Sequence, residues 1–268
     1  MGTTLTTPET ERLLAAVSTA GVETVVFAGG DPSLRQDIGS LLGFAYDLGL
    51  RTEVHTNAHH APASFREALA GAGCVGLSLD GPTGELHDAF RNKPGNFARV
   101  LDLLGFLDRA AVPVVVRTLV AKPNHHRVAE IADLLLPFQN VVFWYLLEFS
   151  PVGIGFRNRQ RYELDRARFD DTVDEATSRA AGLLDVVARR HEDKDNAYVM
   201  LTPSGELYGT ATLDSTGVYP PVGSILRDHL SDLAAAVGFE RQPHEERYRY
   251  VERVLDQRRE ILARTLLP

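Results

Sequence analysis

Five short runs of β-branched and other apolar residues alternate with helix-like segments over the first 148 residues, and this alternation limits the choice of fold. The runs lie at 22–27, 52–56, 74–80, 113–121 and 140–148, and the helical segments at 8–19, 36–48, 62–71, 96–110 and 125–136. Strands separated by helices are usually parallel and joined by right-handed crossovers. We therefore predict an α/β fold, either a (β/α) barrel or part of one.

The pattern changes after residue 148. We predict a long loop over 150–165, a helix over 166–190, a hairpin over 196–209 and a charged helix over 243–265. The chain is then one domain, in which residues 1–148 form the core. Residues 149–268 form a C-terminal extension of helix and hairpin packed on the same domain.

Charge and cysteine content exclude several classes of protein. The net charge is −8 and no basic stripe occurs, so we expect no nucleic-acid partner and no anionic membrane partner. No apolar run could span a bilayer and no leader pattern is visible, which favours a cytoplasmic protein. Cys74 is the single cysteine, which excludes internal disulfides and Cys-rich zinc sites. We expect it to be a small core residue.

Polar residues concentrate where the predicted strands end, in AGGDP, HTNAHH, SLDGP, VRTLVAKPNHH and LLEFSP. In parallel α/β folds these ends form the ligand site. Gly29 and Gly30 would let backbone approach a ligand, and Asp31 would accept hydrogen bonds from an ammonium group. Ser78 and Asp80 alternate toward one side of their strand. Arg91 lies in a segment that could fold over the site and present a guanidinium to a carboxylate.

Other interpretations of these strand ends stay open. Five histidines, with Asp31 or Asp80, could ligate a divalent metal in a barrel hydrolase; they are His55, His59, His60, His125 and His126. Lys122 could form a Schiff base. The simpler interpretations are exposed loop histidines and a solvated lysine. Glu148, which closes the fifth run, is our candidate catalytic acid or base.

Three segments taken together resemble the radical S-adenosylmethionine (SAM) superfamily. They are VVFAGGDPSL at 25–34, HTNA at 55–58 and VGLSLDGPTGELHDAFRNKPGNFARVLDLL at 75–104. The resemblance covers roughly residues 8–148 and implies a partial (β/α) barrel of the radical SAM type. It also implies SAM as a cofactor.

The resemblance assigns roles to individual residues. Gly29, Gly30 and Asp31 correspond to the turn that holds the methionine ammonium of SAM, and Ser78 and Arg91 correspond to residues that bind its carboxylate. We assign three further residues at the neighbouring strand ends to the same cofactor site: Asn57, Asp80 and Arg117.

A narrower resemblance continues toward the C-terminus. YELDRARFDDTV, NAYVMLTPSGEL and GSILRDHLSDLAAAVGF resemble the C-terminal part of viperin-type enzymes, which act on nucleoside triphosphates. This implies a small-molecule or nucleotide-like substrate. Viperin-like proteins hold phosphates with basic residues on the fourth and fifth of these strands. The inward candidates here are Arg117, Lys122 and apolar neighbours such as Trp144.

The family also uses a [4Fe–4S] cluster held by a CxxxCxxC loop, and Cys74 cannot supply three thiolates. Both that loop and the family's first strand would lie before residue 8. One hypothesis is an N-terminally truncated radical SAM enzyme. The other is a cluster-free relative that keeps the SAM cleft for binding, for non-radical chemistry or as the non-catalytic partner of an active enzyme. With the first strand missing, 22–27 becomes a sheet edge that residues 1–7, the C-terminal helix or a partner protein would cover.

Overall fold

Six parallel strands form the main sheet, and their order in the sheet follows their order in the sequence. The computed structural model describes residues 4–190, 199–209 and 218–239. The strands are β1 (Thr24–Phe27), β2 (Arg51–Thr56), β3 (Cys74–Ser78), β4 (Val114–Val120), β5 (Val141–Glu148) and β6 (Val186–Arg189). All five predicted runs are strands, and the predicted α/β fold with a partial barrel is confirmed.

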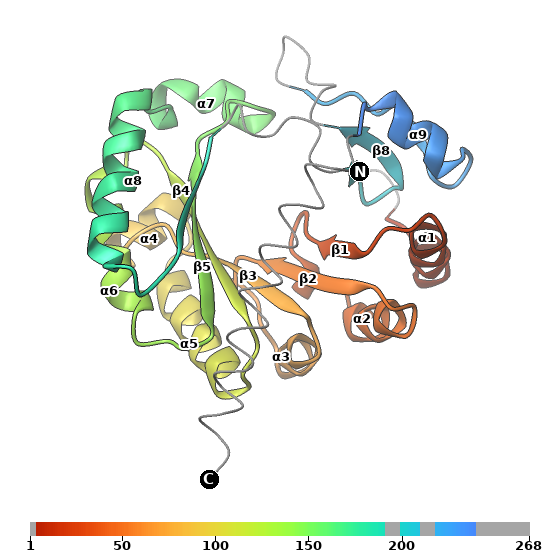
Figure 1. Cartoon of the computed structure of the whole chain (residues 1–268), viewed down its shortest axis with the longest axis horizontal. Coiled ribbons are helices and arrows are strands. Elements are labelled where there is room, and N and C mark those ends of the chain that lie inside the picture. The colour runs from red at the N-terminus through yellow and green to blue at the C-terminus, as the bar shows by residue number, and fades with distance from the viewer. Residues whose placement is uncertain (1–3, 191–198, 210–217, 240–268) are drawn as a thin grey trace.

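Helix α1 precedes the first strand and the other helices follow strands, and most of them lie along the outer face of the curved sheet (Figure 1). They are α1 (Thr7–Thr19), α2 (Ile38–Asp47), α3 (Ala63–Ala70), α4 (Gly84–Arg91), α5 (Asn96–Arg109), α6 (Ile131–Leu135), α7 (Ile154–Tyr162) and α8 (Arg166–Ala180). Short 3-10 helices, η1 (Pro32–Leu34) and η2 (His125–Glu130), follow β1 and β4. None of the helices in the described part of the chain is long and apolar enough to cross a membrane.

The structure corrects the prediction in three places. The predicted loop over 150–165 contains α7, a helix with mostly exposed side chains and therefore no apolar stripe to mark it in the sequence. The helix predicted over 166–190 ends at Ala180, because Ala181 and Gly182 adopt left-handed backbone angles, φ 52° and 73°. The following residues form β6, which pairs with β5 beyond the predicted core boundary at residue 148. The segment after β3 contains α4, which the sequence analysis did not predict.

The two faces of the sheet have different surroundings. The outer face packs on the helices through the largest apolar cluster, which includes Val54, Leu77, Val116 and Trp144. The inner face carries a smaller cluster of apolar and aromatic side chains: Cys74, Val115, Val142, Phe143 and Tyr145. Trp144 is fully buried on the outer side, where its indole Nε1 donates to Thr118 Oγ1 at 2.8 Å, so its predicted inward orientation was wrong.

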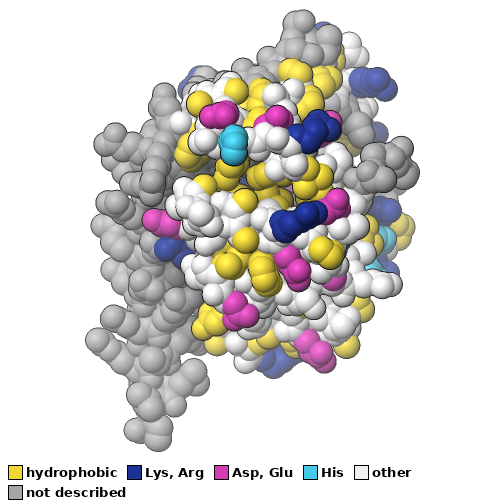
Figure 2. Space-filling model, turned by 90° about the vertical axis from the view of Figure 1, so that its right-hand side faces the viewer, with side chains coloured by type: hydrophobic (Ala, Val, Ile, Leu, Met, Phe, Trp, Pro, Cys, Tyr) yellow, Lys and Arg dark blue, Asp and Glu magenta, His cyan; other side chains and the backbone are white. Residues whose placement is uncertain are grey.

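A small antiparallel sheet packs beside α1. It consists of β7 (Val199–Leu201), β8 (Glu206–Gly209) and β9 (Gly223–Ser224), and α9 (Leu230–Ala236) follows it. Strands β7 and β8 confirm the predicted hairpin, and the predicted helix at 243–265 lies outside the described residues. Ile225 and Leu230 pack on the apolar cluster of α1 and α2, and Leu5 N donates to Pro203 O at 2.7 Å. On this side of the molecule, hydrophobic side chains reach the surface between acidic and basic ones (Figure 2).

Strand β1 lies at one edge of the main sheet, as predicted. Within the ranges that the structure describes, no backbone hydrogen bond reaches its outer edge. Val26 is 38% exposed, so part of this strand faces solvent. Coverage of this edge by a partner protein stays a prediction.

Candidate functional site

The Gly29–Gly30–Asp31 turn follows β1 and is anchored to the end of β2. Gly29 and Gly30 have φ 72° and 49°, and no atom lies within 4 Å of the position that a Cβ would take. Backbone conformation, rather than crowding, therefore requires glycine here. Asp31 accepts hydrogen bonds from Ser33 N at 3.0 Å, Thr56 Oγ1 at 3.0 Å and Asn57 N at 2.9 Å. A carboxylate has about four acceptor positions, so Asp31 keeps room for one more donor.

The carboxylate of Asp80 is held by groups of the protein itself. Its side chain is fully buried, its Oδ1 accepts from Leu119 N at 2.8 Å, and its Oδ2 forms an ion pair with Arg91 Nε. The carboxylate thus accepts a hydrogen bond from the backbone of β4 that a backbone carbonyl would accept in a regular pair of strands. Both oxygens have protein partners, which favours a structural role for this carboxylate; the assignment of Asp80 to the cofactor site stays a prediction. Arg91 meets a carboxylate as predicted, but that carboxylate belongs to Asp80.

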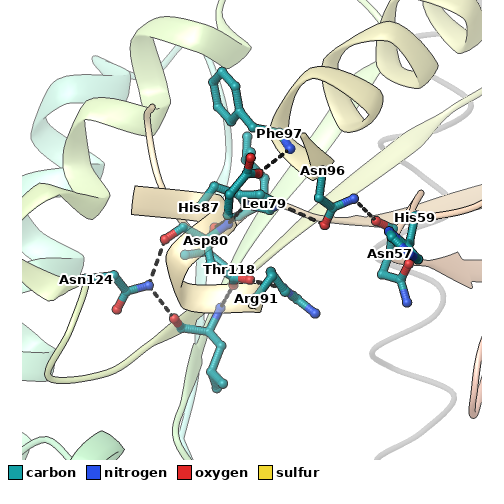
Figure 3. A network of polar contacts seen from close by, with 12 residues as sticks. Asn57, His59, Leu79, Asp80, His87, Arg91, Asn96, Phe97, Thr118 and Asn124 are labelled. Carbon is teal, nitrogen blue, oxygen red and sulfur yellow. Dashed lines mark hydrogen bonds and ion pairs between the residues drawn. The ribbon is translucent and has the colours of Figure 1, made fainter. Parts of the chain in front are cut away.

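Asp80 is also part of a buried polar network that joins the ends of β2, β3 and β4 (Figure 3). Its backbone N–H donates to His87 Nδ1 at 3.0 Å, and His87 Nε2 meets Asn96 Oδ1 at 3.2 Å. Asn96 Nδ2 donates to Asn57 O at 3.0 Å. Asn124 Nδ2 donates to Asp80 O at 2.9 Å and to Leu119 O at 2.8 Å. The network therefore fixes three strand ends relative to one another.

Burial lowers the pKa of His87. Because Nδ1 accepts a hydrogen bond, the neutral ring carries its proton on Nε2 and donates it to Asn96. Sequence analysis missed the network residues His87, Asn96 and Asn124. All three lie in segments rich in polar and charged residues, so nothing in the sequence singles them out.

Charged and aromatic side chains gather on the inner face of the sheet. We call Glu53, His55, Arg117, Tyr145 and Arg189 the inner-face cluster. His55 Nε2 lies 2.5 Å from Glu53 Oε1 and 3.5 Å from Arg117 Nη1. The guanidinium carbons of Arg117 and Arg189 lie 5.7 Å and 5.1 Å from the centre of the Tyr145 ring. Arg117 thus faces inward as predicted. His55 was predicted only as a possible metal ligand, and Glu53, Tyr145 and Arg189 were not predicted as site residues.

Ser78 ends β3 directly beside Arg117, with which it pairs across the sheet. Its side chain is half-buried at the carboxyl end of the sheet. The turn at Gly29–Asp31 after β1, Ser78 at the end of β3 and Arg117 beside it in β4 therefore lie toward the same end of the sheet. This is the arrangement expected for one binding site.

The remaining single-residue candidates lie elsewhere. Lys122 is exposed and donates through Nζ to Gln160 O at 3.2 Å, so it lacks the desolvation that a Schiff-base lysine needs. Glu148 ends β5 one residue after the inward-facing Leu147, and strand alternation places it on the side of Trp144 and Leu146. Its catalytic role stays a prediction.

The histidines do not form a metal site. His55 contacts Glu53 on the inner face, His59 and His60 are exposed after β2, and His125 and His126 begin η2. In the described ranges, no group of three or more His, Cys, Asp or Glu side chains could hold a metal ion. The barrel-hydrolase alternative therefore has no ligand set there.

Cys74 does not fit an iron–sulfur cluster. It begins β3, is 7% exposed and packs with Val115 and Phe143, as predicted for a core residue. Burial raises the pKa of its thiol well above the ordinary value, which disfavours the thiolate that a cluster needs. The 268 residues contain no other cysteine. These residues therefore do not hold a [4Fe–4S] cluster.

Comparison with known proteins gives consistent matches. A family model described as the Radical SAM superfamily matches residues 2–135. An AdoMet-dependent heme synthase of Nitratidesulfovibrio vulgaris is 30% identical over 149 residues, which is 55% of this chain and 40% of that protein. A PqqA peptide cyclase of Rhodopseudomonas palustris is 28% identical over 195 residues, 68% of this chain and 50% of that protein. The chain thus spans about half the length of these relatives or less.

Solved structures share the fold. SuiB of Streptococcus suis bound to its precursor peptide SuiA matches with a TM-score of 0.67 and 18% identity, over 88% of this chain and 58% of that one. Native anSMEcpe with bound AdoMet matches with a TM-score of 0.65 and 15% identity, over 85% and 71% of the two chains.

Proposed function

This chain belongs to the radical SAM superfamily, whose model matches half of its length, and from that premise we propose that it binds SAM at the carboxyl ends of β1–β4. The observation that carries the proposal is the convergence of the Gly29–Gly30–Asp31 turn, Ser78 and Arg117 on one end of the sheet. SAM, when bound, supplies an electrophilic sulfonium group for group transfer or C–S cleavage.

The residues of the chain would divide the recognition of SAM between them. The turn backbone and the remaining acceptor position of Asp31 suit an ammonium group, because the carboxylate is already held in place by Thr56 and Asn57. Arg117 and Ser78 offer donors for the carboxylate of SAM. The ion pair between Arg91 and Asp80 does not contact SAM in this proposal; it fixes the loop between β3 and α4.

Titration calorimetry of the full chain with SAM tests this proposal. We expect saturable binding that weakens about ten-fold in Arg117→Gln, the cost of one charge-assisted hydrogen bond. Arg99→Gln, which changes an exposed arginine of α5, is the matched control and should bind like the wild type. Absence of saturable binding to the wild-type chain would refute the proposal.

For the substrate, we propose a small molecule or nucleotide-like compound on the inner face of the sheet. The viperin-type resemblance of the C-terminal segments favours the nucleotide-like class. Members of the family named above are enzymes, which favours an enzymatic role for this chain as well.

A second candidate is a cluster-free member that supports an active enzyme. Two observations favour it: Cys74 is buried, and no backbone hydrogen bond of the described residues reaches the outer edge of β1. Anaerobic treatment of the 268-residue chain with iron and sulfide tests this cluster-free candidate. We expect no stoichiometric iron and sulfide to remain bound after desalting. A stable cluster at one per chain would overturn this candidate.

A further inference from the structure

Arg189 is a cation on the inner face that the proposed binding of SAM does not use. Leu147 pairs with Arg189 and Tyr145 pairs with Val187, so Arg189 lies two residue pairs closer to the carboxyl end of the sheet than Tyr145. Its guanidinium lies over that ring at 5.1 Å. Phe143 stacks on the same ring with a centroid distance of 6.0 Å and an angle of 10°. The arginine is thus seated on an aromatic platform at the site end of the sheet.

The guanidinium of Arg189 has no acidic partner in the described part of the chain. The neighbouring Arg190 pairs with Asp170 at 2.7 Å, and other arginines of the outer helices have similar pairs. On the inner face, the carboxylate of Glu53 contacts His55, with 2.5 Å between Oε1 and Nε2. Within the described residues, the guanidinium of Arg117 makes one hydrogen bond, the long 3.5 Å contact with His55. Two guanidinium groups therefore share a ring, and neither forms a salt bridge with a carboxylate of the described residues.

The surroundings of Arg189 disfavour an unpaired cation. Its side chain is half-buried beside the apolar inner-face residues Phe143, Leu147 and Val187. Partial burial of a charge costs free energy unless an opposite charge or hydrogen-bond acceptors compensate. A planar guanidinium held on a ring presents its N–H donors in a fixed fork, which matches the two oxygens of a carboxylate or phosphate.

We propose that Arg189, seated on Tyr145, binds an oxyanion group of the substrate, either a carboxylate or a phosphate. The proposal rests on the proposed function for the location of the substrate, and it deepens that function by naming the charged group recognised. Arg117 would remain with the carboxylate of SAM, so the two cations would recognise two different ligands. Tyr145 is a positioning residue, because it holds the guanidinium and contacts the anion only through it.

Anion titrations of the full chain without SAM test the proposal. The probes are inorganic phosphate and glutarate, and the tighter of the two identifies the oxyanion source. We expect saturable binding of at least one probe, weakened about ten-fold in Arg189→Gln and less in Arg189→Lys, which keeps the charge but loses the planar fork. Arg99→Gln should bind the probe like the wild type. Urea midpoints of all variants confirm that they fold.

Two results would overturn the proposal: no saturable binding of either probe to the wild type, or equal binding by Arg189→Gln. The SAM titration is measured separately on the same proteins. We expect Arg189→Gln to keep its affinity for SAM within about two-fold, because Arg117 is unchanged. Failure of the wild type to bind SAM would refute the proposed function, whereas the phosphate and glutarate titrations would still decide the role of Arg189.

Discussion

Replacement of Arg91 by glutamine would leave a buried carboxylate without its cation. The Asp80 side chain is 0% exposed and the Arg91 side chain 29% exposed, so the carboxylate has little access to water. After the change, Asp80 keeps the hydrogen bond from Leu119 N at 2.8 Å as its remaining described partner. The strand ends that Asp80 connects would then carry an uncompensated charge.

The expected magnitude follows from this geometry. Removal of one partner from a buried ion pair costs about 3–5 kcal/mol. Because Arg91 is partly exposed, water can replace some of its contribution, and we expect a loss of about 3 kcal/mol in the free energy of unfolding. Asp80→Asn removes the charge but keeps an oxygen for Leu119 N, and should cost about 1–2 kcal/mol. The double variant should be no less stable than Arg91→Gln alone, which gives a coupling energy of at least about 1–2 kcal/mol.

Urea unfolding followed by circular dichroism measures these differences. Arg99→Gln should change the free energy of unfolding by less than about 0.5 kcal/mol, as exposed substitutions usually do. Additive losses in the double variant would contradict the reasoning. If Arg91→Gln left stability unchanged and weakened SAM binding instead, Arg91 would be a cofactor ligand and its pairing with Asp80 would carry little free energy.

Three further outcomes follow from the same region. Burial lowers the pKa of His87, so below pH about 6.5 the unfolded chain binds more protons than the folded chain. The free energy of unfolding should therefore fall as the pH drops below that value. His87→Gln should flatten the pH dependence of the urea midpoint. Asn124→Ala removes three buried hydrogen bonds and should cost about 3 kcal/mol in urea unfolding, and a loss below about 1 kcal/mol would contradict a structural role for this side chain. Gly30→Ala places a Cβ on a residue with φ 49° and should lower the free energy of unfolding by about 1–2 kcal/mol. Gly43→Ala, in α2 with open space around it, should raise the free energy of unfolding by about 0.5–1 kcal/mol. Equal effects of the two substitutions would contradict the role of the turn.

The apolar runs in the sequence predicted the main strands because parallel strands covered on both faces need continuous apolar residues. Because these runs are apolar on both faces, the sequence does not show which side chains face the helices and which face the inner side of the sheet. Trp144 and Tyr145 are adjacent and both apolar in character, and the sequence could not predict that Trp144 packs outward while Tyr145 faces the inner cluster. Strand β6 was missed because Leu183 and Val187 continue the helical spacing of the preceding residues, whereas the left-handed Ala181 ends that helix.

The strand ends bring the turn at Gly29–Asp31, Ser78 and Arg117 to one end of the sheet, where we propose that SAM binds. The role of Asp80 could not be predicted, because an aspartate that replaces a strand carbonyl and one that faces a ligand look alike in a sequence. Arg189 was missed because it belongs to a strand that was predicted as helix. Its position on the inner face depends on the pairing of β6 with β5.

The buried polar network also limits the order in which the chain can fold during synthesis. The carboxylate of Asp80 meets Leu119 N, 39 residues later, and its carbonyl meets Asn124, 44 residues later. A nascent chain that has left the ribosome only as far as β3 would therefore hold this aspartate without its partners. We expect β1–β3 to remain loosely packed until β4 and η2 emerge, and to become resistant to proteolysis in a single step once Asn124 is available.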